Sequence, residues 1–121
     1  VAATRVLVSA ICSLTSPPKV LIQTSAVGFY GDLGDQICDE KTLAGDGFLS
    51  EVCQEWEKAC EPAAEAGIRT VVFRFGLVLG VEGGILRAVL PLFKLGLGSK
   101  LGSGRQWMSW IALEDLTGLF Q

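Results

Sequence analysis

The chain has 121 residues, half of them hydrophobic, and a net charge of −3 at neutral pH. This length is enough for one domain with a core, and the apolar fraction excludes an intrinsically disordered chain. An acidic balance offers no electrostatic surface for nucleic acid or for an anionic membrane, so we expect neither as a partner. No apolar run reaches the roughly 18 residues of a membrane-spanning helix, and the first residues lack the features of a signal peptide.

The first part of the chain alternates between predicted helices and strands. Apolar positions at helical spacing predict a helix over residues 2–12. The β-branched, apolar run 19–25 predicts a buried parallel strand. Residues 48–61 form the clearest predicted helix, in which an apolar stripe faces the core, polar positions such as Ser50 face solvent, and Pro62 ends or kinks the helix.

The second part continues the same alternation, which indicates an α/β protein with a parallel sheet. We expect, in chain order, a buried strand at 69–75, an apolar helix at 85–95, a glycine-rich loop at 96–104, a short strand at 107–113 and a last helix that begins at Glu114 and Asp115. No internal repeat is visible, so the pattern favours one domain or most of one.

The chain has four cysteines and no histidine. The cysteine spacings do not match a zinc site, and the lack of histidine excludes a Ser-His-Asp or Cys-His nucleophile system. Cys53 and Cys60 lie seven residues apart on one helical face, which favours burial as small apolar groups. We therefore expect no metal, reduced thiols and a cytoplasmic location, with any acid–base chemistry left to Tyr30, a carboxylate, a lysine or a cysteine.

Polar and glycine-rich turns follow the two buried strands. Ser25 and Tyr30 follow the first strand, and a turn at residues 76–80 follows the second. Ligands of open parallel sheets bind beyond the carboxyl ends of the strands, so these hydroxyls could face a ligand held against the turn. The alternative is that Ser25 caps a loop and Tyr30 packs beneath it.

The G-x-G-x-x-G fingerprint of a dinucleotide-binding loop is absent. The glycines of 96–104 follow a predicted helix rather than a strand, so this segment is interpreted as a loop. Trp107 and Trp110 either close a pocket or belong to the core. Arg105 and Gln106 could orient a polar ligand, although Arg105 could equally be a solvated surface residue.

Five stretches follow the order and spacing of a known family, and together they cover nearly the whole chain: TSAVGFYGD, GFLSEVCQEWEKAC, RFGLVLG, GGILRAVLPLFKLGLG and GSGRQWMSWI. They resemble the epimerase family branch of the atypical extended short-chain dehydrogenases/reductases, some members of which are labelled SulA-like cell-division inhibitors. The resemblance implies part of an NAD(P)-binding, Rossmann-type, doubly wound parallel sheet whose first βαβ half is missing. Residues 1–121 would be the C-terminal portion of a single domain, and residues 81–110 would contribute to a small substrate-side lobe.

The resemblance also implies roles for particular residues. Ser25 lies near the active-site serine position of sugar epimerases, which makes Ser25 and Tyr30 the candidate catalytic hydroxyls. A cofactor, NADP rather than NAD, would lie against the segment whose backbone passes the nicotinamide: Arg74, Phe75, Gly76, Leu77 and Val78. The candidate substrate-pocket residues follow a G-x-G-x-Q-like element: Arg105, Gln106, Trp107 and Trp110.

Two departures from the family pattern affect its chemistry. The superfamily's Tyr-x-x-x-Lys pair is absent, and Leu49 and Cys53 occupy the corresponding spacing. Met108 stands where an arginine clamps the pyrophosphate of a nucleotide sugar, and a thioether cannot replace a bidentate guanidinium. Nucleotide sugars are therefore poor substrate candidates.

Three interpretations of function remain open. The full-length protein is an NAD(P)-binding epimerase- or oxidoreductase-like protein with a non-standard or lost Tyr-Lys pair, acting on an unidentified small molecule. Alternatively, it is a non-catalytic, nucleotide-binding regulatory protein, like the cell-division inhibitors, that acts through a protein partner. In a third interpretation the 121-residue chain, lacking the phosphate loop, is inactive and binds nothing by itself, and its uncovered strand edges lead to self-association.

Overall fold

The computed structural model describes residues 1–100 and 102–120. The chain divides into two compact units, Val1–Arg74 and Phe75–Gln121. None of the helices among the described residues has the length and apolar character that crossing a membrane requires. The expectations of a single domain portion and of a substrate-side lobe at 81–110 stay predictions.

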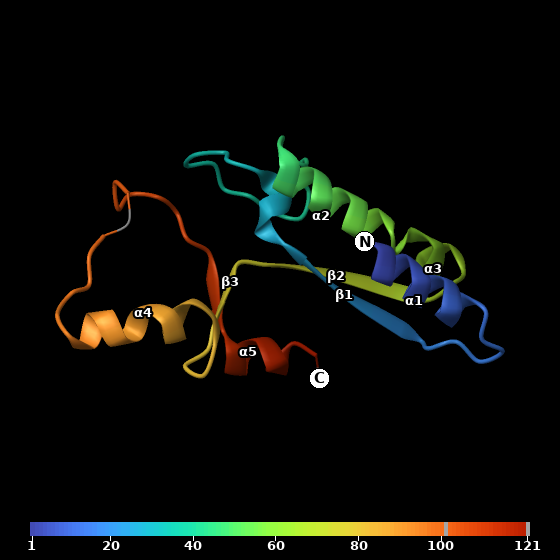
Figure 1. The fold of residues 1–121 in the computed structure, drawn as a ribbon. Coiled ribbons are helices and arrows are strands. Elements are labelled where there is room, and N and C mark those ends of the chain that lie inside the picture. Colours follow the sequence, from blue (N-terminus) through green and yellow to red (C-terminus); the bar gives the residue numbers. More distant parts are fainter. Residues whose placement is uncertain (101, 121) are drawn as a thin grey trace. The chain divides into compact units, whose positions relative to one another are not determined.

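A two-stranded parallel sheet forms the base of the first unit (Figure 1). Strand β1 (Val20–Ala26) pairs with strand β2 (Arg69–Phe75). The backbone N–H of Arg69, at the start of β2, donates to the carbonyl of Lys19, just before β1, at 3.2 Å. Since this bond joins the beginnings of both strands, the strands run in the same direction, as the sequence predicts. Their carboxyl ends therefore lie at one edge of the sheet.

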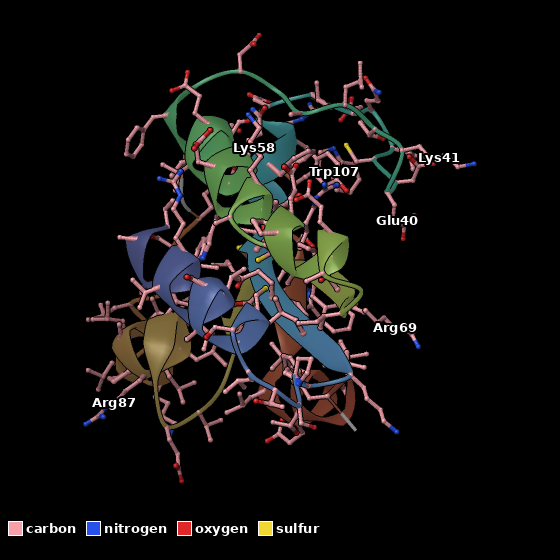
Figure 2. All side chains as sticks on the ribbon, turned by 90° about the vertical axis from the view of Figure 1, so that its right-hand side faces the viewer. Glu40, Lys41, Lys58, Arg69, Arg87 and Trp107 are labelled. Carbon is pink, nitrogen blue, oxygen red and sulfur yellow. The ribbon has the colours of Figure 1, made fainter. Side chains whose placement is uncertain are left out.

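Helices cover one face of this sheet (Figures 1 and 2). Helix α1 (Ala2–Cys12) has the bounds that the sequence predicts. The predicted helix at 48–61 is divided, because α2 (Phe48–Lys58) ends before a separate short helix, α3 (Glu61–Glu65). Pro62 lies in the first turn of α3, where its missing N–H costs no hydrogen bond, so the proline begins a helix instead of kinking one.

The small core of the first unit lies between α1, α3 and β1. Val8, Ala63 and Ile68 are buried there, and partly buried side chains of α1 and β1 pack against them. The indole Nε1 of Trp56 donates to Thr4 Oγ1 at 2.8 Å, which ties α2 to α1. The core thus holds the helices on one face of the sheet.

The buried face of α2 differs from the predicted stripe. Ser50, predicted to face solvent, is only 1% exposed, whereas Phe48 and Leu49 are 75% and 67% exposed. The prediction was wrong because the Ser50 hydroxyl finds backbone carbonyl partners, which makes its burial inexpensive. Cys53 and Cys60 are buried, as the sequence predicts.

The second unit contains a second pair of short parallel strands. Strand β3 (Leu77–Leu79) pairs with β4 (Trp110–Ala112). Helix α4 (Gly84–Lys94), which contains Pro91, follows β3, and helix α5 (Leu113–Gly118) follows β4. The sequence predicts α4 and the start of α5 but not β3. Leu101, inside the predicted loop 96–104, lies outside the described residues.

Glycine is required at position 76, between β2 and β3. A Cβ atom there would overlap the backbone carbonyl of Ser109. The same carbonyl accepts a hydrogen bond from the backbone N–H of Leu77 at 2.9 Å. The close approach of these two backbones sets the start of the β3–β4 pairing.

Candidate functional site

The carboxyl ends of β1 and β2 bring three of the predicted site residues together. Ser25 is the second-last residue of β1, Tyr30 ends the 3₁₀ helix η1 (Val27–Tyr30) that follows it, and Arg74 is the second-last residue of β2. The parallel strands place these side chains at one edge of the sheet, where α/β proteins hold their ligands.

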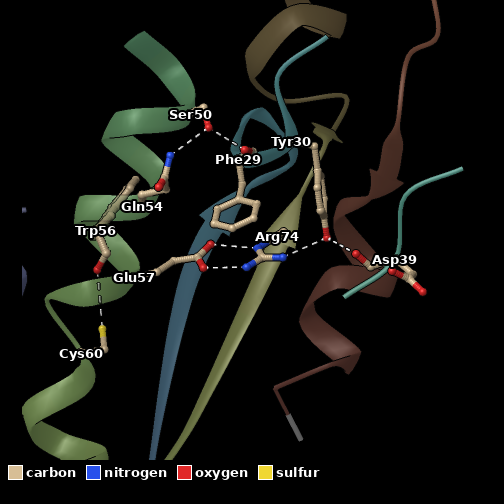
Figure 3. A network of polar contacts seen from close by, with 9 residues as sticks. All are labelled: Phe29, Tyr30, Asp39, Ser50, Gln54, Trp56, Glu57, Cys60 and Arg74. Carbon is tan, nitrogen blue, oxygen red and sulfur yellow. Dashed lines mark hydrogen bonds and ion pairs between the residues drawn. The ribbon is translucent and has the colours of Figure 1, made fainter. Parts of the chain in front are cut away.

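Arg74 is the centre of a polar network (Figure 3). Its Nε and Nη2 donate to the two carboxylate oxygens of Glu57 at 2.9 and 2.8 Å. The guanidinium carbon lies 3.4 Å from the centre of the Phe29 ring, so the aromatic face packs against the cation. The bidentate pair joins α2 to β2, and both side chains are largely buried.

The Tyr30 hydroxyl is held from both sides. It accepts a hydrogen bond from Arg74 Nη1 at 3.0 Å and donates to the backbone carbonyl of Asp39 at 2.9 Å. Its ring also meets the Phe29 ring edge to face, with 5.3 Å between the ring centres. The phenol is therefore oriented by a cation on one side and a carbonyl on the other.

The hydrogen bonds of the network favour the ionised forms of Glu57 and Arg74. Burial is the largest single influence on Glu57 and raises its pKa, but the hydrogen bonds and charge of Arg74, together with Ser25, outweigh burial and lower the pKa below its usual value. The pKa of Arg74 is raised, chiefly by its hydrogen bonds to Glu57. Both groups are thus ionised at neutral pH, and the pair has no net charge.

Ser25 is buried at the carboxyl end of β1. It is 6% exposed, and its hydroxyl makes no hydrogen bond with the residues that the structure describes. The hydroxyl is nevertheless near enough to the Glu57 carboxylate to help lower the pKa of that group. A buried hydroxyl without a direct partner usually has a reason, such as a ligand or an ordered water.

Ser50 anchors the segment that carries Tyr30. Its Oγ lies 2.7 Å from the carbonyl oxygens of both Phe29 and Gly45, and it accepts a hydrogen bond from Gln54 Nε2 at 3.3 Å. Position 45 has no room for a Cβ atom, because the Tyr30 carbonyl lies against it. Helix α2 therefore holds η1 against the loop of residues 31–46, which contains Gly45.

A half-open cavity of about 430 Å³ lies beside the network, lined by Val27, Tyr30, Cys38, Asp39, Glu40, Val72, Phe73 and Arg74. The pKa of Asp39 is lowered, first by the hydrogen bond from the Thr42 hydroxyl and then by the Lys41 backbone N–H. Two carboxylates and a guanidinium already neutralised by Glu57 disfavour an anionic ligand. The cavity suits a neutral or cationic ligand with hydroxyl or amine donors.

The other predicted site residues belong to the second unit. Leu77 and Val78 form part of β3, where Leu77 is paired with Trp110 of β4. The Phe75 ring centre lies 6.3 Å from that of Phe120. Trp107 and Trp110 are 79% and 61% exposed.

Their neighbours in sequence are placed in the same unit. Gly76 lies against the Ser109 backbone, and Arg105 is exposed, with its backbone N–H 3.3 Å from Ser103 Oγ. Gln106 precedes Trp107 in the same exposed segment. The cofactor and substrate-pocket roles of these residues stay predictions.

Sequence reasoning missed Glu57 and Asp39 as members of the site. Glu57 lies four residues after Cys53 and three before Cys60, which is the spacing of one helical face. A carboxylate on a face predicted to be buried was a usable signal, because buried charges need a partner. Asp39 contributes only its backbone carbonyl to Tyr30, so no side-chain pattern could have revealed it.

Parallel strands joined through helices, with polar side chains at their carboxyl ends, define an α/β protein of Rossmann type, in the class of the short-chain dehydrogenases/reductases. No protein-family model matches the chain. It is similar to a nucleoside-diphosphate sugar epimerase from Corynebacterium glutamicum, with 43% identity and a TM-score of 0.87 over 97% of this chain and 25% of that chain. It is also similar to the human epimerase family protein SDR39U1 (isoform 2), solved with NADPH, with 36% identity and a TM-score of 0.91 over 98% of this chain and 40% of that chain.

The relatives agree on the family. An epimerase family protein of Mycobacterium bovis is 55% identical over 95 residues, which are 78% of this chain and 32% of the relative. The chain belongs to the epimerase family, as its motifs indicate. It spans about a third of the length of the curated relatives that it matches, so it corresponds to one part of their fold.

Proposed function

We propose that the chain is part of an NAD(P)-binding, epimerase-like oxidoreductase in which Ser25 and Tyr30 supply the reacting hydroxyl groups. Membership of the epimerase family supports the class of protein. The human relative was solved with NADPH, which supports a dinucleotide, and NADP in preference to NAD. The small molecule on which the full-length protein acts is an additional partner of unknown structure.

One observation carries this proposal: the Tyr30 phenol, held by Arg74, forms part of a cavity wall at the carboxyl ends of two parallel strands. An oriented hydroxyl beside a fixed cation is suited to exchanging a proton with an alcohol or a carbonyl oxygen. The Tyr30–Arg74 pair, whose members come from different elements, would then replace the tyrosine and lysine that lie four residues apart on one helix in the superfamily. Ser25 provides a second, buried hydroxyl at the end of β1.

The residues present fit one end of the cofactor. The buried Ser25 hydroxyl, without a hydrogen bond inside the described part of the chain, is available to a polar group of the nicotinamide or the substrate. Residues 74–78 are the candidates for contact with the nicotinamide, and residues 105–107 and Trp110 for contact with the substrate. When bound, NAD(P) accepts or supplies a hydride. The sequence contains no G-x-G-x-x-G loop for the pyrophosphate.

A reducing compartment is part of the proposal. All four cysteines are free thiols. Disulfides are rare in the cytoplasm, where we expect the protein, and free thiols agree with that expectation. A relative from Arabidopsis thaliana is named chloroplastic, so members of the family differ in location.

A second candidate function is a non-catalytic, nucleotide-binding regulatory protein that acts through a protein partner. The observation in its favour is that both hydrogen bonds of the Tyr30 hydroxyl are made within the chain, to Arg74 and to the Asp39 carbonyl. In this state the phenol serves to hold the 31–46 loop. Catalysis requires that a substrate oxygen replace the Asp39 carbonyl as the acceptor of the Tyr30 proton.

The test uses the full-length protein that carries this segment and Tyr30→Phe, which removes only the hydroxyl. We expect NADPH binding to be retained and NADPH oxidation with a panel of small carbonyl compounds to fall about 10²- to 10⁴-fold. Ser13→Ala, which removes an exposed hydroxyl of the first unit, is the matched control. Unchanged turnover in Tyr30→Phe excludes Tyr30 from the mechanism, and NADPH binding without any turnover in the wild type favours the regulatory function.

A further inference from the structure

We propose that Glu57 is a positioning residue, which fixes the Arg74 guanidinium so that one of its N–H groups is aimed at the Tyr30 hydroxyl. The inference rests on the proposed function, because it gives Tyr30 a role in the site. It assigns to Glu57 an effect on the reacting hydroxyl that Glu57 does not itself touch.

The geometry of the guanidinium supplies the first step. The group is planar, and its donors point in fixed directions. Glu57 accepts from Nε and Nη2 with two hydrogen bonds of 2.9 and 2.8 Å. Once these two donors are held, the direction of Nη1 is determined, and Nη1 lies 3.0 Å from the Tyr30 oxygen. The carboxylate therefore sets where the third hydrogen bond goes.

The residues around the Glu57–Arg74 pair restrict the orientation of the guanidinium. The Phe29 ring covers one of its faces at 3.4 Å, and the Tyr30 ring centre lies 5.1 Å from the guanidinium carbon. The side chains of Arg74 and Glu57 are 20% and 15% exposed. Because water reaches them poorly, loss of the carboxylate would leave a largely buried cation that must find another acceptor.

Glu57 acts on the Tyr30 hydroxyl only through Arg74. It holds the guanidinium at the end of β2, and the guanidinium in turn donates to the phenol of η1.

The neighbouring residue Glu55 provides a matched comparison on the same helix. It also pairs with an arginine, because Arg5 Nη2 lies 3.0 Å from Glu55 Oε2. That pair is open to water, with side chains 61% and 50% exposed, and it leads to no further side chain of the site. Glu55→Gln therefore removes the same charge from the same helix without affecting Tyr30.

The experiment follows the Tyr30 ring directly. In the full-length protein that carries this segment, tyrosine is labelled with ¹³C on the ring, and the NMR signal of Tyr30 is identified as the one that Tyr30→Phe removes. Spectra of this protein are recorded for the wild type, Glu57→Gln, Arg74→Lys, the double variant and Glu55→Gln, without cofactor or substrate. The double variant separates loss of the Arg74–Tyr30 hydrogen bond from a general change in the field around the ring, because two substitutions that remove the same hydrogen bond do not add.

We expect Glu57→Gln to move the Tyr30 signal in the same direction as Arg74→Lys, and Glu55→Gln to leave it in place. The double variant should move the signal no further than Arg74→Lys alone, because both changes remove the same hydrogen bond. If Glu57→Gln does not fold, Glu57→Asp, which keeps the charge on a shorter side chain, should still displace the signal. A Tyr30 signal that stays at the wild-type position in a folded Glu57 variant overturns the proposal.

The NMR result for Tyr30 does not depend on whether the protein turns over a substrate. Unchanged activity in Tyr30→Phe would refute the proposed function while leaving the displaced signal of Glu57→Gln intact. Conversely, an unmoved signal with a strong activity loss in Tyr30→Phe would refute the positioning role of Glu57 alone.

Discussion

Replacement of Ser50 by alanine tests how the Tyr30 segment is held. The hydroxyl is 1% exposed and lies 2.7 Å from two carbonyl oxygens, but it can donate only one proton at a time. The Phe29 carbonyl keeps a second donor, the Gly45 N–H at 3.0 Å, so Ser50→Ala leaves chiefly the Gly45 carbonyl without its partner. Loss of one hydrogen bond with a polar group left buried costs roughly 1–3 kcal/mol of unfolding free energy.

Urea denaturation followed by circular dichroism measures this cost. Ser9→Ala, on the exposed side of α1, is the matched control and should change the unfolding free energy by less than about 0.5 kcal/mol. A loss in Ser50→Ala no larger than that of the control would refute the reasoning, because the hydroxyl would then contribute nothing to holding η1 against α2.

Three further predictions follow from the same contacts. Gly76→Ala places a methyl group against a backbone carbonyl and should cost about 1–3 kcal/mol in the same denaturation assay, whereas Gly83→Ala, with open space around it, should be tolerated. Because the folded-state pKa of Glu57 lies below its usual 4.5, its pair stabilises the protein above that pH and loses the effect as the pH falls through the lower value; Glu57→Gln should therefore flatten the acid-side decline in stability. Burial raises the pKa of the Cys60 thiol, so a thiol reagent followed by mass spectrometry should label exposed Cys38 at about pH 8 and reach Cys60 only on unfolding. Equal labelling rates would contradict the last prediction.

Local patterns were sufficient for much of the fold. The helix Ala2–Cys12 lies where its apolar spacing predicts it, and the strand Arg69–Phe75 lies where its β-branched, apolar run predicts it. Strand β3 could not be predicted in this way. It has three residues and exists through its pairing with β4, more than 30 residues later, and no local pattern encodes such a pairing.

The sequence predicted which residues lie at the ends of the strands, but it did not predict the hydrogen bonds that connect them to helix α2. The position of Ser25, Tyr30 and Arg74 at one edge of the sheet was predictable because residues that follow neighbouring parallel strands gather there, while their roles stay predictions. Glu57 was missed because its partner lies 17 residues away on another element. Ser50 was predicted to face solvent because a helical hydrophobicity pattern treats serine as polar. In the structure two backbone carbonyls can accept from its hydroxyl, which makes its burial possible.

A crystal structure of the full-length protein with NADP(H) tests the central claim most directly. The account predicts that the nicotinamide ring lies at the carboxyl ends of β1 and β2, in contact with Ser25 or Tyr30, with Arg74 still paired to Glu57. A nicotinamide ring bound away from both hydroxyls would contradict it.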